Sequence, residues 1–154
     1  MNRVRVARER NSNNATANLA DPVASVTHLH VAAGILRDKA VRVLISERLC
    51  DGPFHGLWEF PGGKIGPGET STQALCRELI EEIGVDVTQS QPLMSLNHEY
   101  PDRTVDIEFF LINDWHHEPI GREGQRLRWV DIALLDAEKL LPADLPVVEA
   151  IKKL

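Results

Sequence analysis

The stretch that decides the fold spans residues 63–85 and has the sequence GKIGPGETSTQALCRELIEEIGV. Its second half carries apolar residues at helical spacing. Thr70 and Gln73 have the spacing of a capping box, in which each side chain pairs with the backbone of the other residue. Gly84 can end a helix in the left-handed conformation. The pattern therefore predicts a helix over residues 70–83.

The predicted helix has two chemically distinct faces. At about 100° per residue, one broad apolar face contains Leu75, Cys76, Leu79, Ile80 and Ile83. The other face carries Glu78, Glu81 and Glu82, whose carboxylates repel one another by a few tenths of a kcal/mol per exposed pair. Two interpretations follow: a solvated helix face, or a site for a hard cation such as Mg²⁺, which takes oxygen ligands and keeps substrate phosphates in its shell.

The loop before this helix favours a ligand site. Residues 61–69 have the sequence PGGKIGPGE. Glycine lets the backbone approach a ligand closely, and a glycine carbonyl can itself bind metal. Lys64 can meet phosphate as a point charge. Ordinary turn chemistry would also produce a glycine-rich loop, so the argument rests on its position beside the acidic helix.

Gly63, Glu69 and residues 77–85 together match a known signature at every fixed position, so the segment resembles the Nudix box. The resemblance implies an α/β (α+β) protein, an α/β/α sandwich with a mixed sheet between helices. It implies that the loop–helix–loop binds Mg²⁺ or Mn²⁺. It also implies that Arg77 and Glu69 brace the loop, which places Glu69 among the catalytic residues. The implied metal ligands are Gly62, Gly63, Glu78, Glu81 and Glu82.

Further segments are similar to the MutT subfamily, which removes oxidised guanine nucleotides: residues 58–64, 99–103, 123–125 and 142–146. The resemblance covers residues 28–154. It implies that Glu123 is a further metal ligand or a base, the alternative being a surface acid. The implied substrate contacts are Arg48, Glu59, Phe60, Pro61, Gly62, Lys64, Arg103 and Asp144.

Several of these contacts also have purely structural interpretations. A strand-terminal arginine such as Arg48 is often just solvated, and Arg103 follows a turn where a charge needs no function. Phe60 could stack on a base or pack in the core, whereas Trp58 is assigned to packing.

Asp144 departs from the resembled subfamily, which commonly has Asn there to recognise the purine. An amide donates and accepts hydrogen bonds, whereas a carboxylate only accepts. Aspartate in this context also resembles pyrimidine-triphosphate Nudix enzymes. A structural alternative is that Asp144 caps the final helix.

Composition limits the remaining possibilities. A chain of 154 residues suits one domain, predicted over residues 26–154, after a tail at 1–25 that we expect to be disordered or, alternatively, a transit peptide. The net charge of −6 argues against stable nucleic-acid binding. No apolar run is long enough for a membrane span, and Cys50 and Cys76 are too far apart for a ligand pair. We expect a cytoplasmic protein with free thiols, monomeric or dimeric.

The rest of the chain predicts a small mixed sheet. Runs at 29–36 and 41–45 indicate two adjacent strands with a hairpin-like connection around residues 37–39. A short strand is expected near 57–60. Further strands are expected at 93–100, 104–112 and 127–130, with a final helix at 146–154.

The leading hypothesis is metal-dependent hydrolysis of 8-oxo-dGTP to 8-oxo-dGMP and pyrophosphate. Glu78 is the first choice for the base and Glu123 the second. The alternatives are a pyrophosphohydrolase for CTP or oxidised pyrimidine nucleotides, a hydrolase of ADP-ribose or dinucleoside polyphosphates, and a non-catalytic nucleotide sensor.

Overall fold

The computed structural model describes residues 27–154, so the predicted tail at 1–25 lies outside the described residues. Within these residues the chain forms seven strands, two α-helices and two 3₁₀ helices. The strands are β1 (Thr27–Leu36), β2 (Arg42–Glu47), β3 (Trp58–Glu59), β4 (Gly62–Lys64), β5 (Asp86–Tyr100), β6 (Arg103–His116) and β7 (Leu127–Asp131). The helices are α2 (Ser71–Ile83), α3 (Leu145–Lys152) and two 3₁₀ helices, η2 (Ile132–Ala137) and η3 (Pro142–Asp144).

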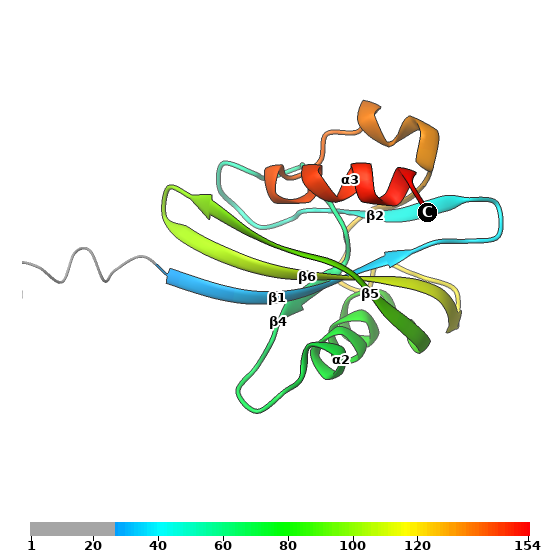
Figure 1. The fold of residues 1–154 in the computed structure, drawn as a ribbon, viewed down its shortest axis with the longest axis horizontal. Coiled ribbons are helices and arrows are strands. Elements are labelled where there is room, and N and C mark those ends of the chain that lie inside the picture. The colour runs from blue at the N-terminus through cyan, green and yellow to red at the C-terminus, as the bar shows by residue number, and fades with distance from the viewer. Residues whose placement is uncertain (1–26) are drawn as a thin grey trace, which may run out of the picture.

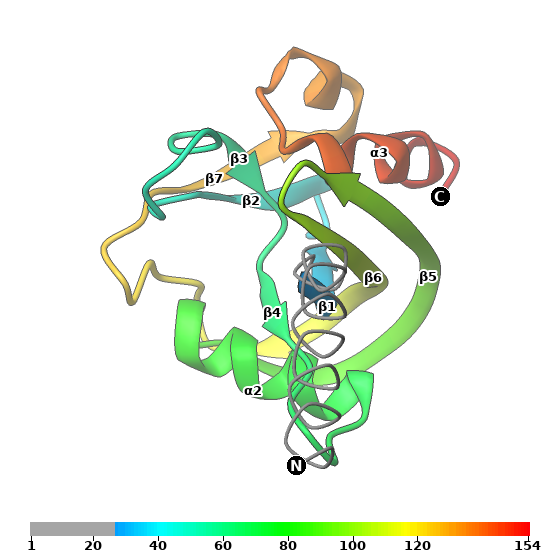
Figure 2. The ribbon, with the colours of Figure 1, turned by 90° about the vertical axis from the view of Figure 1, so that its left-hand side faces the viewer.

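The strands form two sheets between α2 and α3. A four-stranded mixed sheet has the order β4-β1-β6-β5, with β1 and β6 parallel, and a three-stranded antiparallel sheet has the order β3-β2-β7. The two helices lie on opposite sides of these sheets (Figures 1 and 2). One apolar cluster packs beneath α3 and the other beneath α2. The expected sandwich with a mixed sheet is confirmed.

The hairpin-like connection predicted between the first two strands is confined to the turn itself. β1 and β2 belong to different sheets and are joined only at an isolated bridge between Arg37 and Val43. The connection itself is a tight turn, in which Asp38 accepts hydrogen bonds from the backbone N–H of Ala40 and Arg42. Val41 has a φ of 61°. A local apolar pattern predicts that two strands exist, but their pairing depends on distant partners such as β6 and β7.

Helix α2 agrees closely with the prediction. Thr70 caps it in a complete capping box with Gln73, and Gly84 ends it with a φ of 68°. Its buried residues are Ala74, Leu75, Leu79 and Ile83. Ile80, predicted on the apolar face, is 44% exposed, because the sheet contacts the side of the helix that carries Ala74. The buried face of the helix is therefore rotated away from Ile80, toward the side that carries the glutamates.

The glycine-rich loop contains a strand that the sequence pattern did not predict. β4 pairs antiparallel with β1, where Ala33 opposes Gly62. A Cβ on Gly62 would lie 2.1 Å from the carbonyl oxygen of Ala32, so only glycine fits there. This close pairing fixes the loop beside the middle of β1.

The other predicted elements are present with shifted ends. β5 and β6 are longer than expected, and register shifts interrupt their pairing between Val87 and Met94. The final helix begins one residue earlier than predicted and ends at Lys152. Within residues 27–154, no helix is long and apolar enough to cross a membrane.

Candidate active site

Arg77 ties the glycine-rich loop to helix α2. Its guanidinium donates from Nε and Nη2 to the two oxygens of Glu69, at 2.8 Å each, and from Nη2 to the carbonyl of Lys64 at 3.0 Å. Glu69 also accepts the N–H of Gly66 at 2.7 Å. These hydrogen bonds, led by those from Arg77, lower the pKa of Glu69 to about 2. The carboxylate is fully engaged and weakly basic, which suits bracing rather than proton transfer.

Two of the three helix glutamates face the loop. The Glu78 carboxylate lies over Gly63, where a Cβ would come within 2.2 Å of its carboxyl carbon. Glu82 accepts the N–H of Gly62 at 3.3 Å. Glu81 is exposed, with one oxygen 3.4 Å from Nη1 of Arg77. The acidic face of the helix is therefore only partly solvated, and Glu78 and Glu82 meet the glycines across a short gap.

Glu82 has the electrostatic character of a cation ligand. Burial, together with the charges of the Glu78, Glu123 and Glu59 carboxylates and against the opposing Gly62 hydrogen bond, raises the pKa of Glu82 to about 8. A buried carboxylate among others is stable only if it takes a proton or binds a positive ion. The oxygen-rich group around Glu82 therefore fits a hard divalent cation.

The loop between β6 and β7 delivers Glu123 to this cluster. The side-chain amide of Gln125 donates to the carbonyl of Glu82 at 3.0 Å and accepts the N–H of Glu123 at 2.9 Å. The backbone N–H of Arg122 donates to the carbonyl of Glu82, and its guanidinium donates to the carbonyl of Ile80. These bonds satisfy carbonyls that the end of a helix leaves free. In the sequence, Gln125 stands out only as part of a motif and Arg122 does not stand out, because no local pattern predicts their contact with α2.

A cleft of about 370 Å³ extends from the acidic cluster across the face of β1 that carries Leu29, Val31 and Ala33. Arg48 and Glu59 form an ion pair on its wall at 3.1 Å, and Lys64 lies at its rim. Burial raises the pKa of Glu59, against the lowering effect of Arg48 and Arg103. The cleft therefore brings together positive groups from three separate segments, Arg48, Lys64 and Arg103.

The far end of the cleft is closed by Asp144. Its carboxyl is 4% exposed and accepts the backbone N–H of Phe60 at 3.2 Å. Burial raises its pKa to about 8, helped by the charge of Glu59. No hydrogen bond from this side chain caps α3, although the residue stands at the cap position. The capping alternative is therefore wrong, and Asp144 faces the cleft.

Two aromatic residues beside the cleft belong to the core. Phe60 is 4% exposed and packs edge-on against Phe109, so its ring belongs to the core. Trp58, predicted to be a packing residue, is 7% exposed and lies beneath the guanidinium groups of Arg126 and Arg128.

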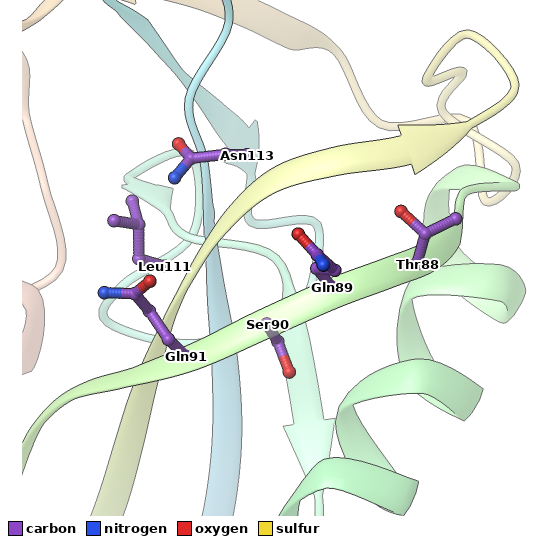
Figure 3. Close-up of a pocket in the computed structure, with 6 residues that line it drawn as sticks. All are labelled: Thr88, Gln89, Ser90, Gln91, Leu111 and Asn113. Carbon is purple, nitrogen blue, oxygen red and sulfur yellow. The ribbon is translucent and has the colours of Figure 1, made fainter.

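Another hollow, of about 480 Å³, lies where β5 and β6 lose register (Figure 3). It is lined by Thr88, Gln89, Ser90, Gln91, Leu111 and Asn113. It contains no charged group and none of the predicted site residues. The charged residues expected to contact the substrate therefore lie in the smaller cleft and not in this hollow.

Comparison with known proteins decides the family. The model of the NUDIX domain matches residues 32–150, which include the whole loop–helix unit. The chain belongs to the Nudix family. Nudix hydrolases generally depend on a divalent metal, in keeping with the oxygen ligands gathered around Glu82.

Individual Nudix relatives are similar over most of the chain. The 8-oxo-dGTP diphosphatase of Escherichia coli is 39% identical over 82% of this chain and 98% of its own. The CTP pyrophosphohydrolase of the same organism is 36% identical over 80% of this chain and 90% of its own. A solved MutT structure, from work on Aliivibrio salmonicida and Vibrio cholerae, has a TM-score of 0.71 and 36% identity, covering 83% of this chain and all of the other.

Proposed function

We propose that this Nudix hydrolase cleaves 8-oxo-dGTP to 8-oxo-dGMP and pyrophosphate, using Mg²⁺ or Mn²⁺. The observation that carries the proposal is the continuous path from the acidic cluster around Glu82 to the buried carboxyl of Asp144. The end near Glu82 suits a metal-bound triphosphate, and the end near Asp144 suits a nucleobase. The names of the relatives at 39% and 36% identity support a nucleoside triphosphate as substrate.

The metal ligands in this proposal are oxygen atoms of the loop, the helix and the following loop: a carbonyl of Gly62 or Gly63, and the carboxylates of Glu78, Glu81, Glu82 and Glu123. A bound divalent cation neutralises phosphate charge and acidifies water. Arg77 and Glu69 act as positioning residues, because both oxygens of Glu69 are held by the arginine.

The reaction adds water to a phosphorus atom and breaks one P–O–P anhydride bond. Glu78 is our first choice to take the proton of the attacking water and Glu123 the second. Lys64 and Arg48 offset charge on the phosphates. Pyrophosphate leaves with the bridging oxygen if the α-phosphorus is attacked, and the monophosphate keeps that oxygen if the β-phosphorus is attacked.

Base recognition in this proposal depends on Asp144 being neutral when the base binds. With a pKa raised to about 8, its carboxyl carries a proton at neutral pH. A neutral carboxyl has a donor and an acceptor, like the amide of asparagine, so it can contact both kinds of group on an oxidised purine edge. The neighbouring Arg103 side chain, which lies over the Tyr100 ring at 5.1 Å, forms part of the same wall.

A second candidate substrate class is CTP or oxidised pyrimidine triphosphates. Asp144 also suits this class, because one carboxyl can hydrogen-bond to a smaller pyrimidine base as well as to a purine. A CTP pyrophosphohydrolase is among the relatives. A non-catalytic sensor is not favoured, since every acid of the box is retained.

The test is a substrate panel with full-length protein and Mg²⁺: 8-oxo-dGTP, dGTP, 5-hydroxy-dCTP, CTP and ADP-ribose. We expect kcat/KM to be highest for 8-oxo-dGTP and at least tenfold above that for dGTP. Equal values for dGTP and 8-oxo-dGTP contradict the proposal, and a preference for CTP or 5-hydroxy-dCTP favours the second candidate. Hydrolysis in ¹⁸O-water, with label found in the monophosphate or in pyrophosphate, identifies the phosphorus attacked.

A further inference from the structure

A cluster of two imidazoles and one carboxylate lies outside the nucleotide cleft. His28 and His30 occupy alternate positions of β1, so their side chains project from the same face of the sheet. Asp106 stands opposite His30 on the parallel strand β6, and these two strands run side by side (Figure 1). One ligand atom from each of the three residues lies within 4.8 Å of the other two.

The carboxylate of Asp106, at the centre of this cluster, is held in place by a residue outside it. Oδ2 of Asp106 lies 2.5 Å from Nε2 of His28 and 3.7 Å from Nδ1 of His30. Its other oxygen accepts a hydrogen bond from the amide of Asn97 at 2.7 Å. A carboxylate oriented by a second residue is the usual arrangement of a metal ligand.

The cluster is separate from the proposed triphosphate site. The residues of β1 that line the nucleotide cleft, Leu29, Val31 and Ala33, alternate with the two histidines and therefore project from the opposite face. The donor atoms also differ in kind. The acidic cluster offers oxygen alone, which suits Mg²⁺, whereas two imidazoles with a carboxylate suit zinc and its neighbours in the transition series.

The geometry leaves room for an ion and its water. Side-chain exposures of 48% for His28, 63% for His30 and 38% for Asp106 make all three accessible. A hollow of about 330 Å³ adjoins His30, Asn97 and Asp106. A tetrahedral zinc ion with bonds of about 2.0–2.1 Å holds its ligand atoms about 3.3 Å apart. The His28–Asp106 separation is shorter than this and the His30–Asp106 separation longer, so modest rotations of exposed side chains suffice.

We propose that His28, His30 and Asp106 bind one zinc ion, with water completing the shell. The ion links the beginning of β1 to β6, and its effect is on stability rather than on the hydrolytic reaction. The inference does not depend on the proposed substrate, because none of its ligands belongs to the cleft.

The test titrates untagged full-length protein with Zn²⁺ in the presence of saturating Mg²⁺, which occupies the oxygen site. We expect one equivalent to bind, to shift the imidazole ¹⁵N resonances of His28 and His30, and to raise Tm. Co²⁺ used as a probe should give the visible absorption of a tetrahedral centre. Absence of zinc binding under these conditions, or shifts confined to other histidines, overturns the proposal in favour of an ordinary surface ion pair.

Variants separate this site from the rest of the protein. His30→Gln and Asp106→Asn should each weaken zinc binding at least tenfold and remove the Tm rise, while turnover with Mg²⁺ stays at the wild-type level. The matched control, His116→Gln with His117→Gln, alters another exposed histidine pair and should bind zinc normally. Glu82→Gln should also keep the zinc equivalent. Wild-type zinc affinity in both His30→Gln and Asp106→Asn contradicts the assignment.

Discussion

Arg77 and Glu69 form a bidentate ion pair, with two N–H groups of the guanidinium donating to the two carboxylate oxygens at 2.8 Å each. The same guanidinium reaches Glu78 at 2.9 Å through Nη1. One arginine therefore sets the position of the loop and of a helix glutamate together. Paired hydrogen bonds of this kind add geometric specificity that a single point charge lacks.

Replacing this arginine by lysine should damage the site more than the fold. Arg77→Lys keeps the charge but removes the planar fork, and we expect kcat/KM to fall about 10–100-fold, as for other residues that orient metal ligands. Steady-state kinetics with a Mg²⁺ titration measures the loss. The matched control is Arg126→Lys, which alters an exposed arginine paired with Glu47 and should leave kcat/KM unchanged. Unaltered kinetics in Arg77→Lys would contradict the positioning role.

A single methyl group at Gly63 should displace a proposed metal ligand. In Gly63→Ala the new Cβ would lie about 2.2 Å from the Glu78 carboxyl carbon. Because that carboxyl is the far end of a flexible side chain, it can swing away, so we expect a folded protein whose kcat falls at least a hundredfold. Tm and kcat are measured together, with Pro67→Ala in the same loop as the control. Normal turnover in a folded Gly63→Ala protein would show that the position of Glu78 is unimportant.

The two candidate bases can be separated by their pH–rate profiles. A general base contributes about 10²–10⁴-fold to the rate, so Glu78→Gln should lower kcat by that factor and remove the acidic limb of the profile. If Glu123 is only a metal ligand, Glu123→Gln should raise the metal concentration needed for activity and keep the acidic limb of the profile. The reverse pattern assigns the base to Glu123, and full turnover in Glu78→Gln excludes it from both roles.

The buried carboxyl of Asp144 should make stability depend on pH. Its pKa is about 8 in the folded protein, against an ordinary value of 3.8, so the folded state holds the proton more tightly. The favourable contribution is complete below pH 3.8 and is lost as the pH rises toward 8. The slope is at most about 1.4 kcal/mol per pH unit.

Asp144→Asn removes this titration and keeps an acceptor for the Phe60 N–H. We therefore expect the free energy of unfolding of the variant, relative to wild type, to increase steadily between pH 5 and 7. Urea unfolding at several pH values gives the difference. A difference that stays constant across this range would mean that Asp144 is already ionised in the folded protein.

Local signals in the sequence were sufficient for helix α2 and its two ends. The capping box of Thr70 and Gln73, and the left-handed Gly84, depend only on near neighbours, and all are present in the structure. The bracing of Glu69 by Arg77 came from the resemblance to a family, and the observed hydrogen bonds agree with it. Spacing along one helix also placed Glu78 and Glu82 on the same side.

Features that depend on distant segments could not be predicted in this way. The pairing of β1 with β6 joins residues 76 positions apart, as in Thr27 with Arg103, and the local pattern indicated only the hairpin-like connection from β1 to β2. Burial of Asp144 depends on its contact with Phe60, 84 positions away. A short acidic side chain before a helix is typical of a cap, and only the packed structure excludes that role here.

The most direct test of the account is crystallographic. Crystals of the full-length protein with Mn²⁺ and a non-hydrolysable 8-oxo-dGTP analogue should show anomalous density between the glycines of β4 and the carboxylates of Glu78 and Glu82, in contact with the triphosphate. The base should lie against Asp144. If the nucleotide binds while both glutamates remain free of metal, the central claim about the acidic helix is contradicted.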